Sequence, residues 1–137
     1  MKQTKSKSRV RDFGEVFTAE REVRAMCDLI PQEVWENIER TFLEPACGNG
    51  NFLVEILARK LRSCATEEDG LKALASIFGI DIQADNCAES RHRLKDMFFA
   101  KFPTANVAQV ETILQKNIVC GDSLAIMQEW ENDGNGI

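Results

Sequence analysis

The fold of this chain is decided by the stretch FLEPACGNGNF, which runs from Phe42 to Phe52. A short apolar run ends there in the carboxylate of Glu44, a glycine-rich loop follows, and an amphipathic helix begins at once. This order is typical of a nucleotide-like ligand held at the end of a parallel strand, because glycines let the backbone approach a ligand closely. The carboxylate predicts that the ligand carries positive charge.

Strand patterns and helix patterns alternate along the whole chain. Helices are expected over residues 18–30, 51–64, 84–102 and 123–130, strands over 41–44, 76–81 and 117–122, and short helical turns over 32–38, 71–76 and 107–114. Thr18 is expected to cap the first helix, and residues 66–70 to form a polar connection. Arg59, Lys60 and Arg62 are expected away from the apolar stripe of their helix. The alternation predicts an α/β fold with a parallel sheet and right-handed crossovers.

Length and composition are those of one soluble domain. The 137 residues suffice for a single core, and no apolar run approaches a membrane span. The basic N-terminus is followed by no apolar segment, so we expect no secretory signal. The five cysteines lie far apart without a CxxC pair, which predicts neither a disulfide framework nor a metal site. A reducing cytoplasm fits this cysteine pattern best.

Charge is distributed unevenly along the chain. Residues 1–11 carry +5, whereas the remaining residues carry 12 basic and 22 acidic side chains, or −10. The first eleven residues are therefore expected to form a basic, disordered arm, and residues 12–137 a single domain. The favoured interpretation of the arm is a solvated terminus, and the alternative is a contact with nucleic-acid phosphates.

Each expected strand ends in a carboxylate, at Glu44, Asp81 and Asp122. Because parallel sheets bind ligands beyond the carboxyl ends of their strands, we expect these three acids to share one site. Three acids at matching positions predict a ligand with several hydrogen-bond donors or a positive charge.

Two classes of ligand compete for this site. A dinucleotide site uses GxGxxG, but residues 48–53 lack the third glycine, and Asp81 lies 31 residues beyond Gly50, whereas that pattern expects about 20. Glu44 would also repel a pyrophosphate. S-adenosylmethionine fits better, because its ammonium and sulfonium groups suit Glu44 and its ribose and adenine can donate to Asp81 and Asp122. A dinucleotide-dependent enzyme remains the weaker candidate.

Four segments of the chain resemble one family. EPACGNG at 44–50 resembles the first motif, D/E-P-x-x-G-x-G, of S-adenosylmethionine-dependent, adenine-specific DNA methyltransferases of restriction-modification systems. FGEVFTA at 13–19 resembles their G-x-x-F-T-P segment, and GIDI at 79–82 and NIVCGDSL at 117–124 resemble the motifs of the next two strands. The resemblance extends from residue 12 to about 130 and implies a Rossmann-like methyltransferase fold.

The resemblance also implies which residues bind the cofactor. They are Phe17, Thr18, Glu44, Ala46, Gly48, Gly50, Asp81, Ile82, Asp122 and Ser123. The first two would lie near the methionine end of S-adenosylmethionine, and the residues of the glycine loop around its amino acid part. Asp81 would hold the ribose hydroxyls with Ile82 against the adenine ring, and Asp122 would accept from the adenine amino group with Ser123 beside it. Ala19 departs from the family's proline, with little expected loss.

A second departure concerns catalysis. The family carries a [D/N/S]-P-P-[Y/F/W] motif that holds the flipped-out base, whereas the three prolines of this chain, Pro31, Pro45 and Pro103, are never adjacent. We therefore expect a partial methyltransferase domain, truncated before the fourth strand and without catalytic residues of its own. DNA would be bound through the missing C-terminal part, with a restriction or specificity subunit as a further possible partner.

Two further expectations concern interactions and isolated residues. The alternative function is a non-catalytic cofactor-binding or interaction subunit, or a remnant, that pairs with another chain. Without a fourth strand, residues 41–44 would form a sheet edge that self-associates or is covered by the N-terminal helix. Arg91, His92 and Arg93 are expected on a wet helix face. Cys47 is expected to be a small spacer, although a thiol at a helix start can become acidic.

Overall fold

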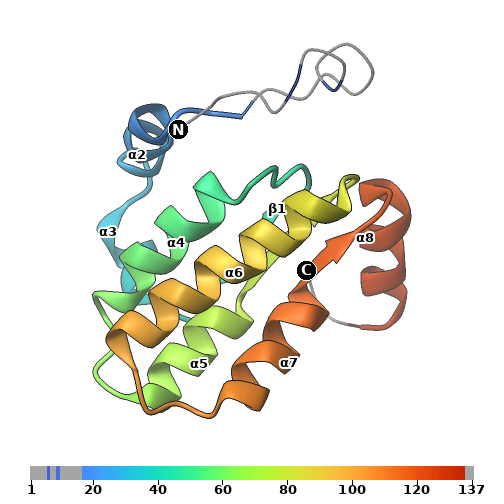
Figure 1. Cartoon of the computed structure of the whole chain (residues 1–137). Helices are drawn as coiled ribbons and strands as arrows, with labels where there is room; N and C mark the ends of the chain where they lie inside the picture. Colours follow the sequence, from blue (N-terminus) through green and yellow to red (C-terminus); the bar gives the residue numbers. More distant parts are fainter. Residues whose placement is uncertain (1–5, 7–8, 10–16, 135–137) are drawn as a thin grey trace.

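The computed structural model describes residues 6, 9 and 17–134. Most of the expected arm over residues 1–11, and Gly14 of the G-x-x-F-T-P-like segment, lie outside these residues. Arg9 is described, and its guanidinium pairs with Asp85 at 2.8 Å. The elements are α2 (Glu20–Cys27), α3 (Gln32–Glu36), β1 (Phe42–Glu44), α4 (Asn51–Leu61), α5 (Glu67–Ala75), β2 (Ile77–Asp81), α6 (Ala84–Lys101), α7 (Val107–Asn117), β3 (Ile118–Cys120) and α8 (Ser123–Asn132) (Figure 1).

The three strands form one parallel sheet in the order β1-β2-β3. Phe42 of β1 pairs with Ile77 of β2, and Gly79 of β2 pairs with Ile118 of β3. The prediction of an α/β fold with three parallel strands and flanking helices is confirmed, and the arrangement is compatible with a partial Rossmann-like fold. Because the three strands are parallel, their carboxyl ends all lie at the same edge of the sheet.

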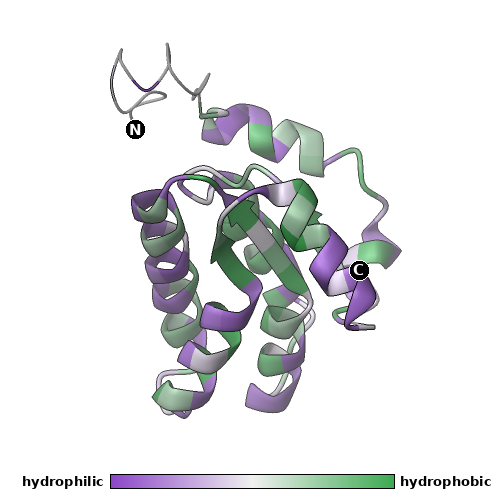
Figure 2. Cartoon of the chain, turned by 90° about the vertical axis from the view of Figure 1, so that its right-hand side faces the viewer, coloured by the Kyte–Doolittle hydropathy of each residue, from purple (hydrophilic) through white to green (hydrophobic). Residues whose placement is uncertain are grey.

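Helices cover the two faces of the sheet unequally. Successive residues of a strand point to opposite faces of the sheet. Gly79 lies on the face that packs against Leu53 of α4, so the side chain of Phe78 points to the other face. Phe78 meets Trp130 of α8 edge to face, with 5.3 Å between ring centroids. Figure 2 shows the hydrophobic strands lying between helices. The larger core lies on the α4 side, and α8 covers part of the other face.

Strand β1 lies at one end of the sheet. The ring of Phe42 stacks on Trp35 of α3 with 5.0 Å between centroids, so α3 covers that side chain. Among the described residues, no strand pairs with the outer edge of β1. The position of β1 agrees with the edge expected from the sequence, and the self-association expected there remains a prediction.

Three helix expectations need correction. Thr18 does not cap α2, because the N-cap is Ala19, whose side chain makes no capping hydrogen bond. Residues 66–70 are not a connection but the start of α5, since Thr66 Oγ1 accepts a hydrogen bond from the Asp69 amide at 3.1 Å and the first turn is acidic. Residues 107–114 belong to a full helix, α7, which Asn106 caps through the Gln109 amide at 3.0 Å.

Lys60 lies in the interior rather than on the wet face of α4, so the expectation for this residue is wrong. Its side chain is fully buried. Its Nζ donates to the carbonyl of Ile38 at 2.9 Å, to the carbonyl of Arg40, and to Ser76 Oγ at 2.7 Å. The ammonium thereby ties the segment before β1 to the end of α5. Burial lowers the pKa of Lys60 to about 8.

We expect Lys60→Met to destabilise the domain. Methionine fills the space of the stem but removes three hydrogen bonds, to the carbonyls of Ile38 and Arg40 and to Ser76 Oγ, which costs about 2–4 kcal/mol of unfolding free energy. The cost should depend on pH. The unfolded-state pKa is about 10.4, so between the two pKa values the unfolded chain binds more protons than the folded one.

The unfolding free energy of the wild type relative to Lys60→Met should therefore rise with pH from about 8 to about 10.4. Urea denaturation of both proteins at several pH values across this window measures the difference. A difference that stays constant with pH would contradict the assignment of a buried, titrating Lys60.

Of the helices in the described part of the chain, none combines the length and the apolar character needed to cross a membrane.

Candidate functional site

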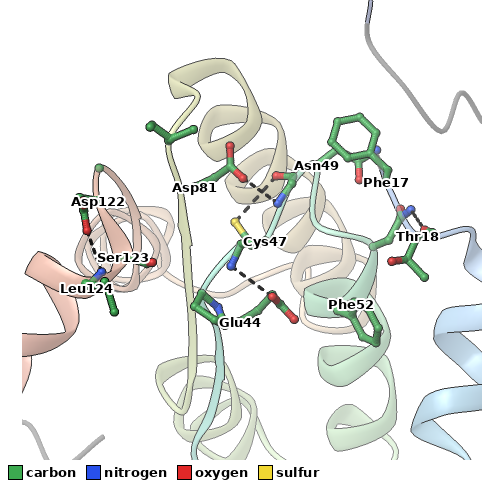
Figure 3. Close-up of a pocket in the computed structure, with 16 residues that line it drawn as sticks. Phe17, Thr18, Glu44, Cys47, Asn49, Phe52, Asp81, Asp122, Ser123 and Leu124 are labelled. Atoms are coloured by element: carbon green, nitrogen blue, oxygen red, sulfur yellow. Dashed lines mark hydrogen bonds between the residues drawn. The ribbon is translucent and has the colours of Figure 1, made fainter. Parts of the chain in front are cut away.

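A pocket of about 470 Å³ lies beyond the carboxyl ends of the three strands. Four segments of the chain line it: residues 17–18, residues 44–52 except 50, residues 81–82 and residues 121–124 (Figure 3). The lining residues are Phe17, Thr18, Glu44, Pro45, Ala46, Cys47, Gly48, Asn49, Asn51, Phe52, Asp81, Ile82, Gly121, Asp122, Ser123 and Leu124. This volume is within the range of about 300–1,000 Å³ for small-molecule sites.

The structure brings nine of the ten residues singled out in the sequence to this pocket. The exception is Gly50, which does not line it. Gly50 has φ 96°, and a Cβ at this position would lie 2.9 Å from Ser90 Oγ and 3.2 Å from Ser90 Cα. Its observed place is therefore at the contact between the glycine loop and α6, where no side chain fits.

Gly48 forms part of the pocket floor. It has φ 54°, in the left-handed region, and an added Cβ would lie 2.8 Å from Cδ1 of Phe17. The Phe17 ring thus rests directly on the glycine loop, although 31 residues separate the two positions. A larger residue at Gly48 would push this ring away.

Glu44 ends β1 and faces the pocket. Its Oε1 accepts a hydrogen bond from the Ala46 amide at 3.1 Å, and burial raises the pKa of its carboxyl. No cationic side chain pairs with Glu44 in the described structure. A positively charged ligand group beside this half-buried carboxyl would stabilise its ionised form.

Asp81 ends β2 and is held firmly by its neighbours. Its Oδ1 accepts from the Gly48 amide at 3.1 Å, while Oδ2 accepts from the Gln83 amide at 3.0 Å and from Asn86 Nδ2 at 2.9 Å. A carboxylate oxygen accepts about two hydrogen bonds. Oδ1 therefore keeps capacity for one further donor, whereas Oδ2 is already fully engaged.

Asp122 follows β3 and caps α8. Its Oδ1 accepts from the amides of Leu124 and Ala125 at 2.9 and 3.2 Å, so Asp122 rather than Ser123 is the N-cap. The neighbouring apolar side chains of the pocket are strongly exposed, with Ile82 at 61% and Leu124 at 79%. Exposed aliphatic groups that line a pocket suit a flat, apolar ligand group.

The sulfur of Cys47 lies in a buried environment. Burial raises the pKa of its thiol to about 12, and Ser90 Oγ lies 3.9 Å away. The thiol is therefore un-ionised near neutral pH, which favours the interpretation of Cys47 as a small spacer rather than a nucleophile. Among the described residues, no group of three or more histidines, cysteines and acids could hold a metal ion.

Sequence reasoning missed the polar network behind the loop. Only His92 of the expected wet cluster is strongly exposed. Arg91 donates to the Ile118 carbonyl at 2.9 Å, and Arg93 donates to the Asn49 carbonyl and to Asn51 Oδ1. The sequence drew attention to Asn49 and Asn51, because both lie within the glycine-rich stretch. It held no such signal for Arg93, which is 42 residues beyond Asn51.

Comparison with known proteins finds one relative. Over 83 residues, 60% of this chain, the sequence is 34% identical to the Type II methyltransferase M.VspI of Vibrio sp. (strain 343). The chain spans 17% of the length of that relative. No family model matches the sequence, and no solved structure matches it either. The chain is thus related in sequence to part of a methyltransferase.

Proposed function

We propose that the strand-end pocket binds S-adenosylmethionine, and that the chain is the cofactor-binding part of a DNA methyltransferase that modifies adenine. The observation that carries the proposal is the convergence on one pocket of four separate segments, each of which resembles a motif of that family. The relationship to a Type II methyltransferase supports it.

The donor set of the pocket fits this cofactor. Glu44 would face the ammonium, and the remaining acceptor capacity of Asp81 Oδ1 would take one ribose hydroxyl. Asp122 would accept from the adenine amino group, with the ring between Ile82 and Leu124. S-adenosylmethionine would supply the methyl group for transfer. The residues of this chain would bind and orient that donor.

Isothermal titration calorimetry of the purified chain tests the proposal. S-adenosylhomocysteine keeps the ammonium, ribose and adenine, so it should bind, whereas NAD should not, because Glu44 repels its pyrophosphate. Binding of NAD but not of S-adenosylhomocysteine would favour a dinucleotide enzyme. Binding of neither would contradict the proposal.

We also propose that the base-binding and DNA-reading groups lie outside these 137 residues, because no Pro-Pro-aromatic motif occurs among them. The chain alone should then transfer no methyl group to DNA that contains adenine. Incorporation of a radiolabelled methyl group into such DNA by this chain would overturn that part of the proposal.

A non-catalytic subunit that pairs with another chain is the second candidate, favoured by the position of β1. Among the described residues the outer edge of β1 has no partner strand, and such edges pair with other chains. Sedimentation equilibrium over a range of concentrations measures whether the chain self-associates, and a monomer at all concentrations would count against pairing with itself.

A further inference from the structure

The wall of the pocket formed by Phe17 and Thr18 is held by two contacts with the glycine segment. Asn51 Nδ2 donates to the Thr18 carbonyl at 2.7 Å. The Phe17 ring rests on Gly48, since a Cβ there would lie 2.8 Å from Cδ1. Figure 3 shows this wall at one end of the pocket and Asp122 at the other. The wall can therefore touch one end of an elongated ligand and not the other.

Arg93 of α6 fixes the glycine segment at two residues, Asn49, which follows Gly48, and Asn51, which holds Thr18. A single nitrogen, Nη1, donates to the Asn49 carbonyl at 2.9 Å and to Asn51 Oδ1 at 2.8 Å. Because the guanidinium occupies the oxygen of the Asn51 amide, the amide nitrogen must point the other way, toward Thr18. Asn51 is 6% exposed, so water offers little competition for these bonds.

We infer that Arg93 is a positioning residue that sets the wall of Phe17 and Thr18 through Asn51, and thereby closes the end of the pocket that takes the amino acid part of the cofactor. The inference rests on the proposed function for the identity of the ligand. It assigns to α6, which contributes no residue to the pocket lining, control over one end of the ligand.

The variant Asn51→Asp breaks the link to Thr18, and because Asn51 also lines the pocket, Arg93→Met tests the same link from outside the pocket. Aspartate keeps an acceptor for Arg93 but presents an oxygen to the Thr18 carbonyl, so the hydrogen bond is lost. A carboxylate in the first turn of α4 interacts favourably with the helix dipole, which offsets part of the free energy lost with this hydrogen bond, and circular dichroism checks that the variant is folded. Affinity for S-adenosylhomocysteine should fall about tenfold, the effect of roughly one hydrogen bond.

Methylthioadenosine, which lacks the amino acid part, supplies the comparison. Its affinity should be unchanged in Asn51→Asp and in Arg93→Met, because the wall does not reach the adenosine end. Arg93→Lys should recover most of the affinity for S-adenosylhomocysteine, since one ammonium can donate to both acceptors. The control Arg91→Met, which removes a neighbouring half-buried arginine, should leave the ratio of the two affinities unchanged.

Hydrogen exchange of the amides of Glu22 and Val23, which both donate to the Ala19 carbonyl next to the wall at 3.0 Å, gives a readout without any ligand. Exchange should quicken in Asn51→Asp and Arg93→Met but not in Arg91→Met. Equal losses for both ligands, or unaltered exchange, would overturn the inference. If the wild type bound neither ligand, the proposed function would fail, and exchange alone would still decide whether Arg93 holds the wall.

Discussion

Replacing Glu44 by lysine should remove almost all binding of S-adenosylhomocysteine. The half-buried carboxylate faces the pocket, and the substitution would place a positive charge against the ligand's ammonium. Breaking one partner of a buried charge pair costs about 2–5 kcal/mol, so the dissociation constant should rise about 30-fold to 1,000-fold or more. Calorimetry measures the affinity, and circular dichroism checks that the variant is folded.

Two control variants test whether the loss of affinity in Glu44→Lys depends on the position and on the charge of the new side chain. Glu39→Lys makes the same change of charge at an exposed residue of the loop before β1, and it should leave the affinity within about twofold of the wild type, since exposed charges are screened. Glu44→Gln removes the charge but keeps an acceptor, so its loss should be intermediate. An unaltered affinity in Glu44→Lys would place the ammonium elsewhere.

The second large effect is expected at Gly50, on stability rather than on binding. Its φ of 96° is unfavourable for alanine, and an added Cβ would lie 3.2 Å from Cα of Ser90, which is backbone and cannot rotate away. Positive φ costs about 1–3 kcal/mol and overpacking about 1–3 kcal/mol more. We expect Gly50→Ala to lose about 3–5 kcal/mol of unfolding free energy, measured by urea denaturation.

Gly134 offers a matched control for this prediction. It also has positive φ, 72°, but no atom of the described residues lies within 4 Å of an added Cβ. Gly134→Ala should therefore show the backbone cost alone, about 1 kcal/mol. Equal losses at the two positions would mean that the contact of the glycine loop with α6 carries no packing cost.

The strands and the location of the pocket could be predicted from the sequence because each depends on a local pattern. Apolar runs that end in Glu44, Asp81 and Asp122 mark three strand ends, and the parallel topology then places the ends at one edge. Phe17, in the described part of the segment 13–19, reaches the glycine loop across the fold, and its role toward a cofactor stays a prediction.

The errors concern residues whose environment is set by contacts distant in sequence. Lys60 has the polarity of a surface residue, yet the carbonyls before β1 and Ser76 Oγ provide acceptors for it in the interior. Arg93 likewise finds its partners in the glycine segment. Neither environment follows from helical periodicity, which specifies the face of a helix but not what the neighbouring element offers to that face.

The five cysteines differ in a way that makes the chain easy to label. Four of them are buried, and Cys120, at the end of β3, is exposed. Its Sγ lies 3.5 Å from the carbonyl of Ile82, a residue of the pocket. A maleimide dye should therefore attach to Cys120 in preference to the buried thiols. The dye would then lie beside a residue of the pocket wall, without any engineered cysteine.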